Sequence, residues 1–210
     1  MKKKVLFGLA VVVFFFASGT SRGSLITNGD FETGDSAGWI FSGSVSVSSD
    51  SDMRTFADGV GTFPTGMFAV SFGAGNHTTS GVIIQDFSAL SNHEYELSFN
   101  YGRFMDGSGG PQSIRVELIN IADNQHLLDT VVTDSSGEKD LSILFSEYNY
   151  RFVALSSSTR LYISDVSAGT FDTDGILDNV GITPVPVPGT ILLFASGLIG
   201  LAGFRRRKIL

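Results

Sequence analysis

The sequence predicts an all-β protein: an antiparallel jelly-roll β-sandwich with an N-terminal signal helix and a C-terminal transmembrane sorting helix. Apolar and polar residues alternate through the middle of the chain, and clusters of Gly, Ser, Asn and Asp separate the alternating runs. Both ends carry an apolar run next to a group of cations. We therefore divide the chain into a signal peptide at 1–23, a β-sandwich at 24–183 and a sorting tail at 184–210.

The N-terminal segment has the pattern of a secretory signal peptide. Cations at 2–4 precede an apolar run at 5–17, and small residues end that run. We expect the secretion machinery and a signal peptidase to remove the segment after Gly19 or, alternatively, after Gly23. An uncleaved anchor is the less favoured alternative, because the apolar run is short.

The clearest strand pattern in the middle of the chain lies at 93–101. Apolar residues occupy the odd positions from Tyr95 to Tyr101, and polar residues occupy the even ones. The run 114–118 alternates in the same way, with Arg115 and Glu117 on its polar side. Such alternation is typical of strands with one buried and one solvated face. Shorter runs complete a set of about ten or eleven strands, at 38–41, 44–48, 67–72, 82–87, 127–133, 141–145, 150–155, 161–166 and 176–183.

Charge is divided sharply along the chain. The segment 24–183 holds all 21 acidic residues and six basic ones, a net charge of −15, while the ends hold the other eight cations. Such an acidic domain repels phosphate backbones, which excludes nucleic acid as a partner. It is compatible with calcium and with neutral sugars. The chain has no cysteine, which excludes disulfides, thiolate metal sites and cysteine catalysis.

Two short segments at the edges of the β-rich region share the pattern of a known family. The first reads Asn-Gly-Asp-Phe-Glu at 28–32, with Gly-Trp at 38–39, and the second is the closing run at 176–183. They resemble the opening and closing strands of galactose-binding-like carbohydrate-binding modules. The resemblance implies a jelly roll, with an immunoglobulin-like sandwich as the alternative, and it implies that the two segments lie side by side.

Many members of that family hold a structural calcium ion where the two segments meet, so the resemblance also implies a metal site. Carried over to this chain, Glu32 and Asp178 are the expected side-chain ligands. Carbonyl groups near Asn28 and Asp30 complete the set, because calcium prefers oxygen ligands from carboxylates and carbonyls. The alternative is that the first acidic pair shapes a turn, while Asp178 is a polar residue on the face of its strand.

Three residues are candidates for sugar binding: Trp39, Tyr101 and Arg103. An exposed aromatic ring can stack on the apolar face of a pyranose, and Trp39 is the only tryptophan in the chain. In this fold a Trp at that point more often fills the core, and we favour this alternative. Tyr101 and Arg103 precede the Gly-rich loop at 106–110, and loops carry binding residues disproportionately. The alternative for Arg103 is a surface cation among carboxylates.

The tail has three parts in a fixed order. Prolines alternate with valines at 184–188, an apolar run follows at 191–204, and four cations come at 205–208. As a helix the run is roughly 21 Å long, which is short for a hydrocarbon core of about 30 Å. The cations are expected to stay in the cytoplasm, which leaves the β-rich region outside. The alternative, a buried core helix, is seldom apolar on all sides and followed by cations.

This order resembles the PEP-CTERM sorting signal of exported bacterial proteins, which an exosortase-type transpeptidase reads. The sequence departs from the commonest form at Val187, where that form has Glu. The resemblance implies an inner-membrane intermediate and a final place in the cell envelope, on the cell surface or in the extracellular matrix. The matching residues are Val185, Pro186, Val187, Pro188, Arg205, Arg206, Arg207 and Lys208.

Signatures of catalysis are scarce. The histidines at 77, 93 and 126 lack metal-ligand spacing, and the sequence has neither a nucleophile elbow nor a phosphate-binding loop. We expect a non-enzymatic, exported, carbohydrate-binding protein of an exopolysaccharide or biofilm matrix, braced by calcium. One alternative is a structural or adhesive matrix protein without a sugar site. The other is a polysaccharide hydrolase, although a carboxylate pair is expected by chance in so acidic a chain.

Overall fold

The computed structural model describes residues 23–49, 63–64, 66–73, 78–105, 109–136 and 143–186. Residues Arg22–Val185 form one compact unit. The signal helix and the sorting helix predicted at the two ends lie outside the described residues. Within the described ranges, no helix has the length and apolar character that crossing a bilayer requires.

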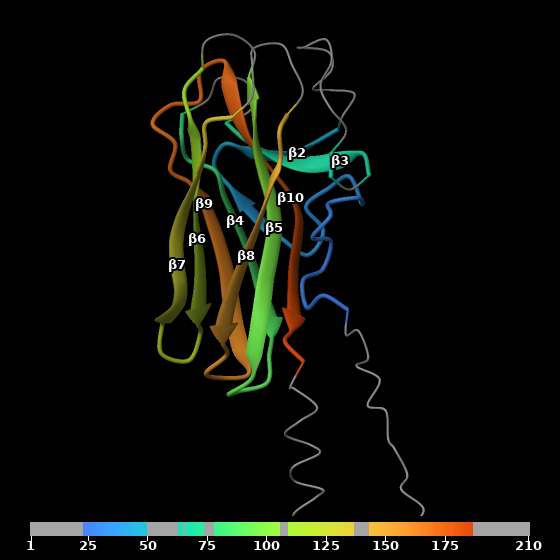
Figure 1. Cartoon of the computed structure of the whole chain (residues 1–210), viewed down its shortest axis with the longest axis vertical. Helices are drawn as coiled ribbons and strands as arrows, with labels where there is room; N and C mark the ends of the chain where they lie inside the picture. Colours follow the sequence, from blue (N-terminus) through green and yellow to red (C-terminus); the bar gives the residue numbers. More distant parts are fainter. Residues whose placement is uncertain are drawn as a thin grey trace, which may run out of the picture. The chain divides into compact units, whose positions relative to one another are not determined.

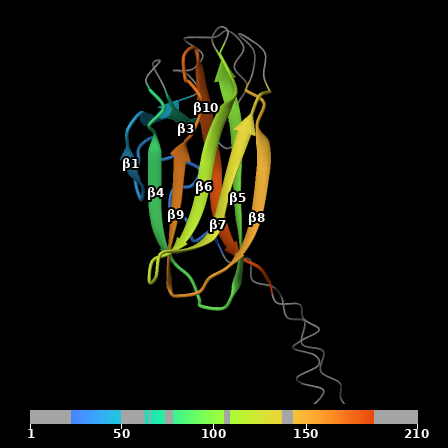
Figure 2. The ribbon, with the colours of Figure 1, turned by 90° about the vertical axis from the view of Figure 1, so that its left-hand side faces the viewer.

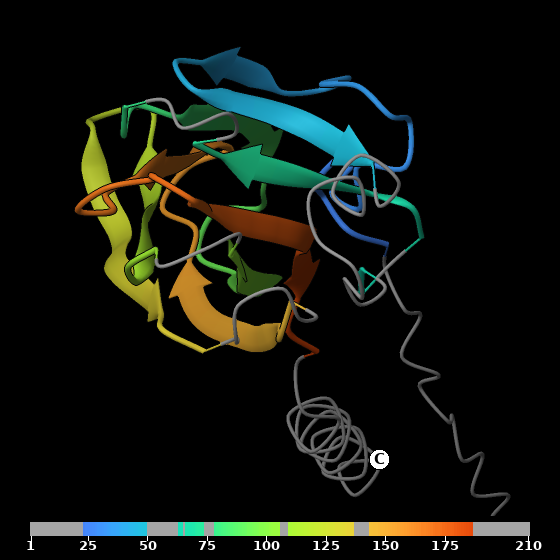
Figure 3. The same ribbon diagram turned by 90° about the horizontal axis from the view of Figure 1, so that it is seen from above.

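The described residues form ten strands in two antiparallel sheets of five, which lie face to face (Figures 1 and 3). Sheet A has the order β1-β4-β9-β6-β7, and sheet B has the order β2-β3-β10-β5-β8. The last strand, β10, lies at the centre of sheet B between β3 and β5, which are distant from it in sequence, as the predicted jelly roll requires. The strands are β1 Ile40–Ser42, β2 Val45–Ser49, β3 Phe68–Phe72, β4 Val82–Ser88, β5 Glu94–Met105, β6 Gln112–Asn120, β7 Gln125–Asp134, β8 Ser146–Val153, β9 Ser158–Asp165 and β10 Thr173–Pro184.

The main core fills the space between the two sheets. Sheet B contributes Leu97 and Phe99 from β5, while sheet A contributes Leu118 from β6 and Ile163 from β9, all fully buried. The Phe99 ring stacks on Tyr148 of the neighbouring β8, with ring centroids 5.4 Å apart. The apolar positions of the alternating runs therefore face inward, which confirms the predicted two-sheet sandwich.

The opening segment, residues 25–34, runs beside the closing strand β10. The Leu25 amide donates to the Ile182 carbonyl, and the Val180 amide donates to the Gly29 carbonyl, each at 2.8 Å. The structure thus brings together the two segments that the family resemblance pairs. The opening segment itself forms turns and bends.

Local backbone geometry explains why the opening segment is irregular. Asn28 and Phe31 have positive φ angles of 49° and 55°, which turn the chain out of a ladder. The side-chain amide of Gln85 on β4 pairs with both backbone groups of Thr27, at 2.7 and 3.0 Å. β10 contributes a bulge between Asp178 and Gly181. The segment is therefore held by both sheets.

A smaller apolar cluster covers part of the outer face of sheet B. Ile143 packs with Phe104 of β5 and Ile176 of β10. Gly102 makes room for it, since a Cβ there would lie 2.7 Å from the Ile143 Cγ2 atom. The strand predicted at 141–145 is therefore wrong over residues 143–145, which cover this face and pair with no strand. The buried members of the outer cluster are Phe63, Ala69, Phe104, Ile143 and Ile176.

The loops gather at two opposite ends of the sandwich (Figure 2). The β4–β5, β6–β7 and β8–β9 loops, at 89–93, 121–124 and 154–157, lie where β10 finishes. We call this the exit end. Val185, the first residue after β10, donates its amide to the Glu94 carbonyl at 2.9 Å. The C-terminal tail therefore leaves the folded unit at the exit end.

Candidate functional site

The outer face of sheet A carries polar side chains arranged around one aromatic residue. Tyr162 lies half-buried on the central strand β9, opposite Glu117 of β6 and Ile84 of β4 in the register. In the next row, Arg160 lies opposite Asp86. Residues two apart on a strand point to the same side, so these rows form one surface. We call it the A face, and its members are Ile84, Asp86, Arg115, Glu117, His126, Asp129, Arg160 and Tyr162.

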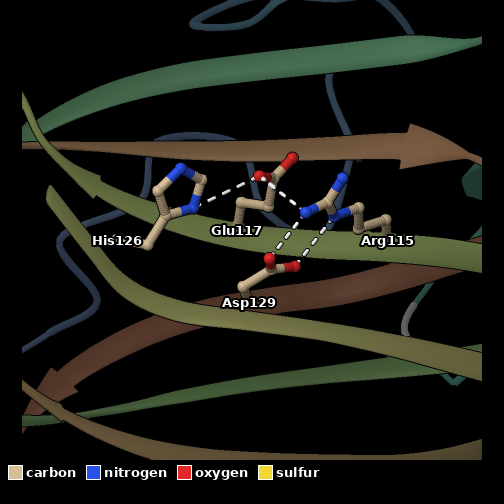
Figure 4. A network of polar contacts seen from close by, with 4 residues as sticks. All are labelled: Arg115, Glu117, His126 and Asp129. Atoms are coloured by element: carbon tan, nitrogen blue, oxygen red, sulfur yellow. Dashed lines mark hydrogen bonds and ion pairs between the residues drawn. The ribbon is translucent and has the colours of Figure 1, made fainter. Parts of the chain in front are cut away.

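One part of the A face is a four-residue polar network on β6 and β7 (Figure 4). The Arg115 guanidinium donates two hydrogen bonds to the Asp129 carboxylate, at 2.8 and 2.6 Å. The same guanidinium lies 3.6 Å from the Glu117 carboxylate. His126 Nδ1 approaches that carboxylate from the other side, at 3.3 Å. Glu117 is thus held between a guanidinium and an imidazole.

The pairing of Arg115 with Asp129 stabilises the charged forms of these two groups. Its hydrogen bond to Asp129 raises the pKa of the guanidinium and lowers the pKa of the Asp129 carboxyl group. The Glu117 side chain is only 11% exposed, whereas the Arg115 and Asp129 side chains are 43% and 41% exposed. The network is therefore anchored on a nearly buried carboxylate and reaches solvent through its other members.

Three members of the network also have the composition of a metal site. Ligand atoms of Glu117, His126 and Asp129 all lie within 4.8 Å of one another. A divalent cation at this point would have to sit beside the Arg115 guanidinium, which already compensates both carboxylates. Electrostatics therefore favours a network compensated by the Arg115 guanidinium over a metal centre.

A second ion pair lies on the other side of Tyr162. Arg160 donates two hydrogen bonds to Asp86, at 2.7 and 2.9 Å, and both side chains are partly exposed. A pair of this kind contributes little to stability. It does hold two donors and two acceptors in a fixed orientation near the aromatic ring.

The A face thus combines an aromatic ring with fixed donors and acceptors of both charge signs. Sugar hydroxyl groups donate to carboxylates and accept from guanidinium groups, and charged partners give the stronger hydrogen bonds. Because guanidinium and carboxylate groups alternate across the face, neither a polyanion nor a polycation is favoured. The arrangement suits a neutral, polyhydroxylated ligand.

Trp39, a predicted sugar-binding residue, is not available for stacking. Its side chain is 6% exposed and belongs to the main core. Its ring packs against Phe31 at a centroid distance of 5.6 Å, and its Nε1–H donates to the Asn28 carbonyl at 3.0 Å. The alternative of a core residue is correct, because the opening segment folds over the ring.

Tyr101, the second predicted sugar-binding residue, is fully buried between the sheets. Its hydroxyl group has no hydrogen-bond partner among the described residues. Burial raises the pKa of Tyr101, and the Asp165 and Asp134 carboxylates raise it further. The prediction that Tyr101 contacts a ligand is therefore wrong, because its side chain belongs to the main core.

Arg103, the third predicted sugar-binding residue, is a structural tie between loops. Its guanidinium donates to the carbonyls of Ser135 and Ser136 after β7, at 3.3 and 3.0 Å. It also donates to the carbonyls of Gly109 and Gly110 before β6, at 3.3 and 3.1 Å. Only 7% of the residue is exposed. Arg103 is neither a ligand contact nor the surface cation considered as its alternative.

The predicted calcium ligands lie on the paired opening and closing segments. Asp178 is fully buried, and its Oδ1 accepts from the Asn179 amide at 2.6 Å. Glu32 Oε1 accepts from the amides of Met67 and Phe68, at 2.8 and 2.9 Å. A buried carboxylate beside a carbonyl-rich turn has the oxygen chemistry that calcium requires. Calcium binding by these residues stays a prediction.

The other two predicted ligands serve the turn itself. The Asn28 side chain makes three hydrogen bonds within the turn: Oδ1 accepts from the Thr33 amide, and Nδ2 donates to the carbonyls of Asp35 and Ala37. Asp30 Oδ1 accepts from the Glu32 amide at 3.5 Å. The backbone carbonyl group of Asn28, which the resemblance implies as a ligand, already accepts from Trp39 Nε1–H at 3.0 Å.

The A face was missed by reasoning from the sequence. The alternating pattern places Arg115 and Glu117 on a solvated side of their strand, and Tyr162 stands between apolar Leu161 and Ile163. Those patterns show which side each residue faces. They do not show which strands are neighbours, and the face exists only because β9 lies between β4 and β6.

Comparison with known proteins agrees with the fold and with the tail. The PEP-CTERM protein-sorting motif matches residues 184–208, which indicates an exported protein that passes through the membrane. No curated protein sequence is similar to the chain at a significant level.

Solved structures of carbohydrate-binding modules share the fold. The chain is similar to a family 61 module in complex with β-1,4-galactotriose, with a TM-score of 0.52 and 18% identity over 77% of this chain and 99% of that one. It is also similar to the first xylan-binding family 22 module of a Paenibacillus barcinonensis protein, with a TM-score of 0.50 and 14% identity over 80% and 99% of the two chains. At these identities the likeness establishes the jelly-roll fold.

Proposed function

We propose that this chain is an exported, non-enzymatic protein that binds a neutral polysaccharide through the A face and is associated with an exopolysaccharide or biofilm matrix. The observation that carries the proposal is the position of Tyr162 on the central strand, between the Arg115 network and the Arg160–Asp86 pair. The fold of the sandwich, shared with carbohydrate-binding modules, supports the same function.

The aromatic ring and the ion pairs of the A face are expected to make different contacts with a sugar. The Tyr162 ring offers an apolar surface to the C–H groups of a pyranose. The ion pairs offer hydrogen-bond groups that are already oriented, so binding costs little side-chain ordering. An open sheet face also has no closed end, so it accommodates an internal stretch of a long glycan.

A glycan array probed with the compact unit, residues 22–185, tests the proposal. We expect retention on neutral glycans, and we expect Tyr162→Ala to weaken binding at least tenfold, about 1.4 kcal/mol. Phe171→Ala is the matched control, because Phe171 is an exposed aromatic residue outside the A face. A folded unit that retains no glycan would favour a structural or adhesive role, and equal losses in the two variants would argue against the A face.

We also propose that calcium braces the junction of the opening and closing segments, with Glu32 and Asp178 as side-chain ligands and carbonyls near Asn28 and Asp30. The pairing of the segments through Gly29 and Val180 supports this assignment. Calcium bound only to the folded state would raise the unfolding temperature by mass action. We expect that rise in the parent protein and its loss in Asp178→Asn, while an equal rise in both would contradict the assignment.

The proposed route of export involves a signal peptidase at the N-terminus and an exosortase-type transpeptidase at the tail. The sorting motif at 184–208 supports an inner-membrane intermediate, followed by a place in the envelope, on the surface or in the matrix. Intact mass of the protein from cells and from medium tests this route. We expect both ends to be missing from the mature protein, and an untrimmed chain in the cytosol would contradict it.

A further inference from the structure

The exit end of the sandwich exposes apolar side chains on neighbouring loops. Leu90, Ile121 and Leu155 lie on the β4–β5, β6–β7 and β8–β9 loops, and they are 52%, 36% and 40% exposed. Val153, at the end of β8, is 48% exposed. Single exposed apolar residues are common on protein surfaces. Four on one end of a small sandwich form a continuous feature if the loops are in contact.

Hydrogen bonds show that these loops are in contact. Ser91 Oγ donates to the Leu155 carbonyl at 2.8 Å, and the Asn92 amide donates to the Ala154 carbonyl at 2.7 Å. The Ile121 amide donates to the carbonyl of Ser158, next to the β8–β9 loop, at 3.2 Å. The three loops therefore lie together at one end of the sandwich (Figure 2), and each of them carries an exposed apolar side chain.

The same end is where the tail leaves. The Val185 amide is bound to the carbonyl of Glu94, directly after the β4–β5 loop. Residues 186–190 separate this point from the apolar run that begins at Ile191. Even fully extended, the six residue steps from Val185 to Ile191 span at most about 22 Å. Whenever the apolar run is inserted in a membrane, the exit end is held within that distance of its first residue.

We propose that the exit end rests on the lipid surface while the tail is inserted, with Leu90, Ile121, Val153 and Leu155 in contact with the interfacial region. The tether keeps the end near the bilayer, so weak apolar contacts suffice to orient the domain. Exposed carboxylates at Glu94 and Asp123 lie beside the patch, so the surface suits lipids without net charge. This inference rests on the sorting motif and is independent of sugar binding.

The docked state has a consequence for the rest of the molecule. The long strands, such as β5, β6 and β10, run from one end of the sandwich to the other (Figure 1), so a domain that rests on its exit end stands with these strands away from the membrane plane. The A face then points sideways, clear of the lipid. Phe171 is 71% exposed on the β9–β10 loop at the opposite end, and there it faces away from the bilayer.

Fluorescence quenching by lipid tests the orientation on the full chain. The chain has no cysteine, so Ser157→Cys at the exit end and Ala168→Cys on the β9–β10 loop each give one labelling site. Both residues are exposed. Each labelled chain is inserted into phosphatidylcholine vesicles that contain a nitroxide-headgroup lipid. We expect quenching at 157 to exceed quenching at 168 by at least threefold, and equal quenching at the two sites would overturn the proposal.

A second comparison tests the apolar residues themselves. The pair Leu90→Asp and Leu155→Asp, added to the 157-labelled chain, is expected to lower quenching at 157, because the tether then holds the exit end near the bilayer without apolar contact. Phe171→Asp is the matched control and should leave the quenching at 157 unchanged. Unchanged quenching in the double variant would refute the role of the loops. The comparison between the two labels in the parent chain decides the orientation even if the double variant does not fold.

Discussion

Replacing Asp174 by Asn tests how burial beside the outer cluster affects stability. Asp174 lies on β10, opposite Phe104 in the register with β5, and it is mostly buried. Burial raises the pKa of its carboxyl group to about 7, with a smaller rise from the Asp165 charge. The hydrogen bond from Ser71 Oγ, at 3.5 Å, opposes the shift only in part. The folded protein therefore prefers the protonated acid.

The sign of the pH effect follows from the two protonation equilibria. In the unfolded chain the carboxyl group ionises near its ordinary pKa of 3.8. Between pH 3.8 and about 7 the folded state holds a proton that the unfolded state has lost, so stability falls as the pH rises. The loss is complete above the folded-state pKa. The difference between the folded and unfolded pKa values corresponds to a loss of folding stability of roughly 4 kcal/mol at most.

Urea unfolding of residues 22–185 at pH 4, 6 and 8 measures this effect. Asn cannot ionise, so we expect Asp174→Asn to be nearly neutral at pH 4 and to stabilise the protein by roughly 2–4 kcal/mol at pH 8. Glu147→Gln, at an exposed position of β8, is the control. We expect it to change the free energy of unfolding by no more than about 0.5 kcal/mol at every pH. A difference between parent and Asp174→Asn that does not vary with pH would refute the reasoning.

Three further substitutions probe polar groups that the structure uses differently. Tyr101→Phe removes a buried hydroxyl group that has no partner among the described residues. Urea unfolding should show the variant to be as stable as the parent or more stable by about 1–2 kcal/mol. A loss of stability of that size would contradict the absence of a hydrogen-bond partner. Arg103→Met leaves four loop carbonyls without their donor. We therefore expect the free energy of unfolding to fall by roughly 3 kcal/mol or more and amide exchange to become faster in both loops. An unchanged stability would contradict the role of Arg103 in holding the loops together. Arg115→Met leaves the Glu117, His126 and Asp129 cluster without its compensating cation. Calorimetry should then detect zinc binding that the parent protein lacks and that a further His126→Ala substitution abolishes. Zinc binding by the parent protein would contradict the view that Arg115 occupies the place of a metal ion.

The strands and their inner faces were predictable from the sequence. Alternation at 93–101 and 114–118 directly reports which side of a strand is buried, because successive side chains point to opposite faces. The prediction failed at 143–145, where apolar Ile143 covers the outside of a sheet and does not extend one. A local pattern cannot distinguish an apolar residue in a strand from one that packs on a strand.

The candidate site was predictable only in part. The opening and closing motifs correctly placed their two segments side by side, as the Val180–Gly29 bond shows. Trp39 and Tyr101 were expected as possible ligand contacts, and both are buried. Aromatic rings are typical of cores and of sugar sites alike, so residue type does not decide between them.

The sequence by itself determined the sandwich, the acidic character of the domain and the sorting motif in the tail, because each depends on composition or on order within a short stretch. Only the tertiary structure decided that Tyr162 stands among the ion pairs of the A face and that three loops meet where the tail leaves. These features depend on which strands are neighbours. Strand neighbours are set by the packing of the whole core, in which residues far apart along the chain must close on one another.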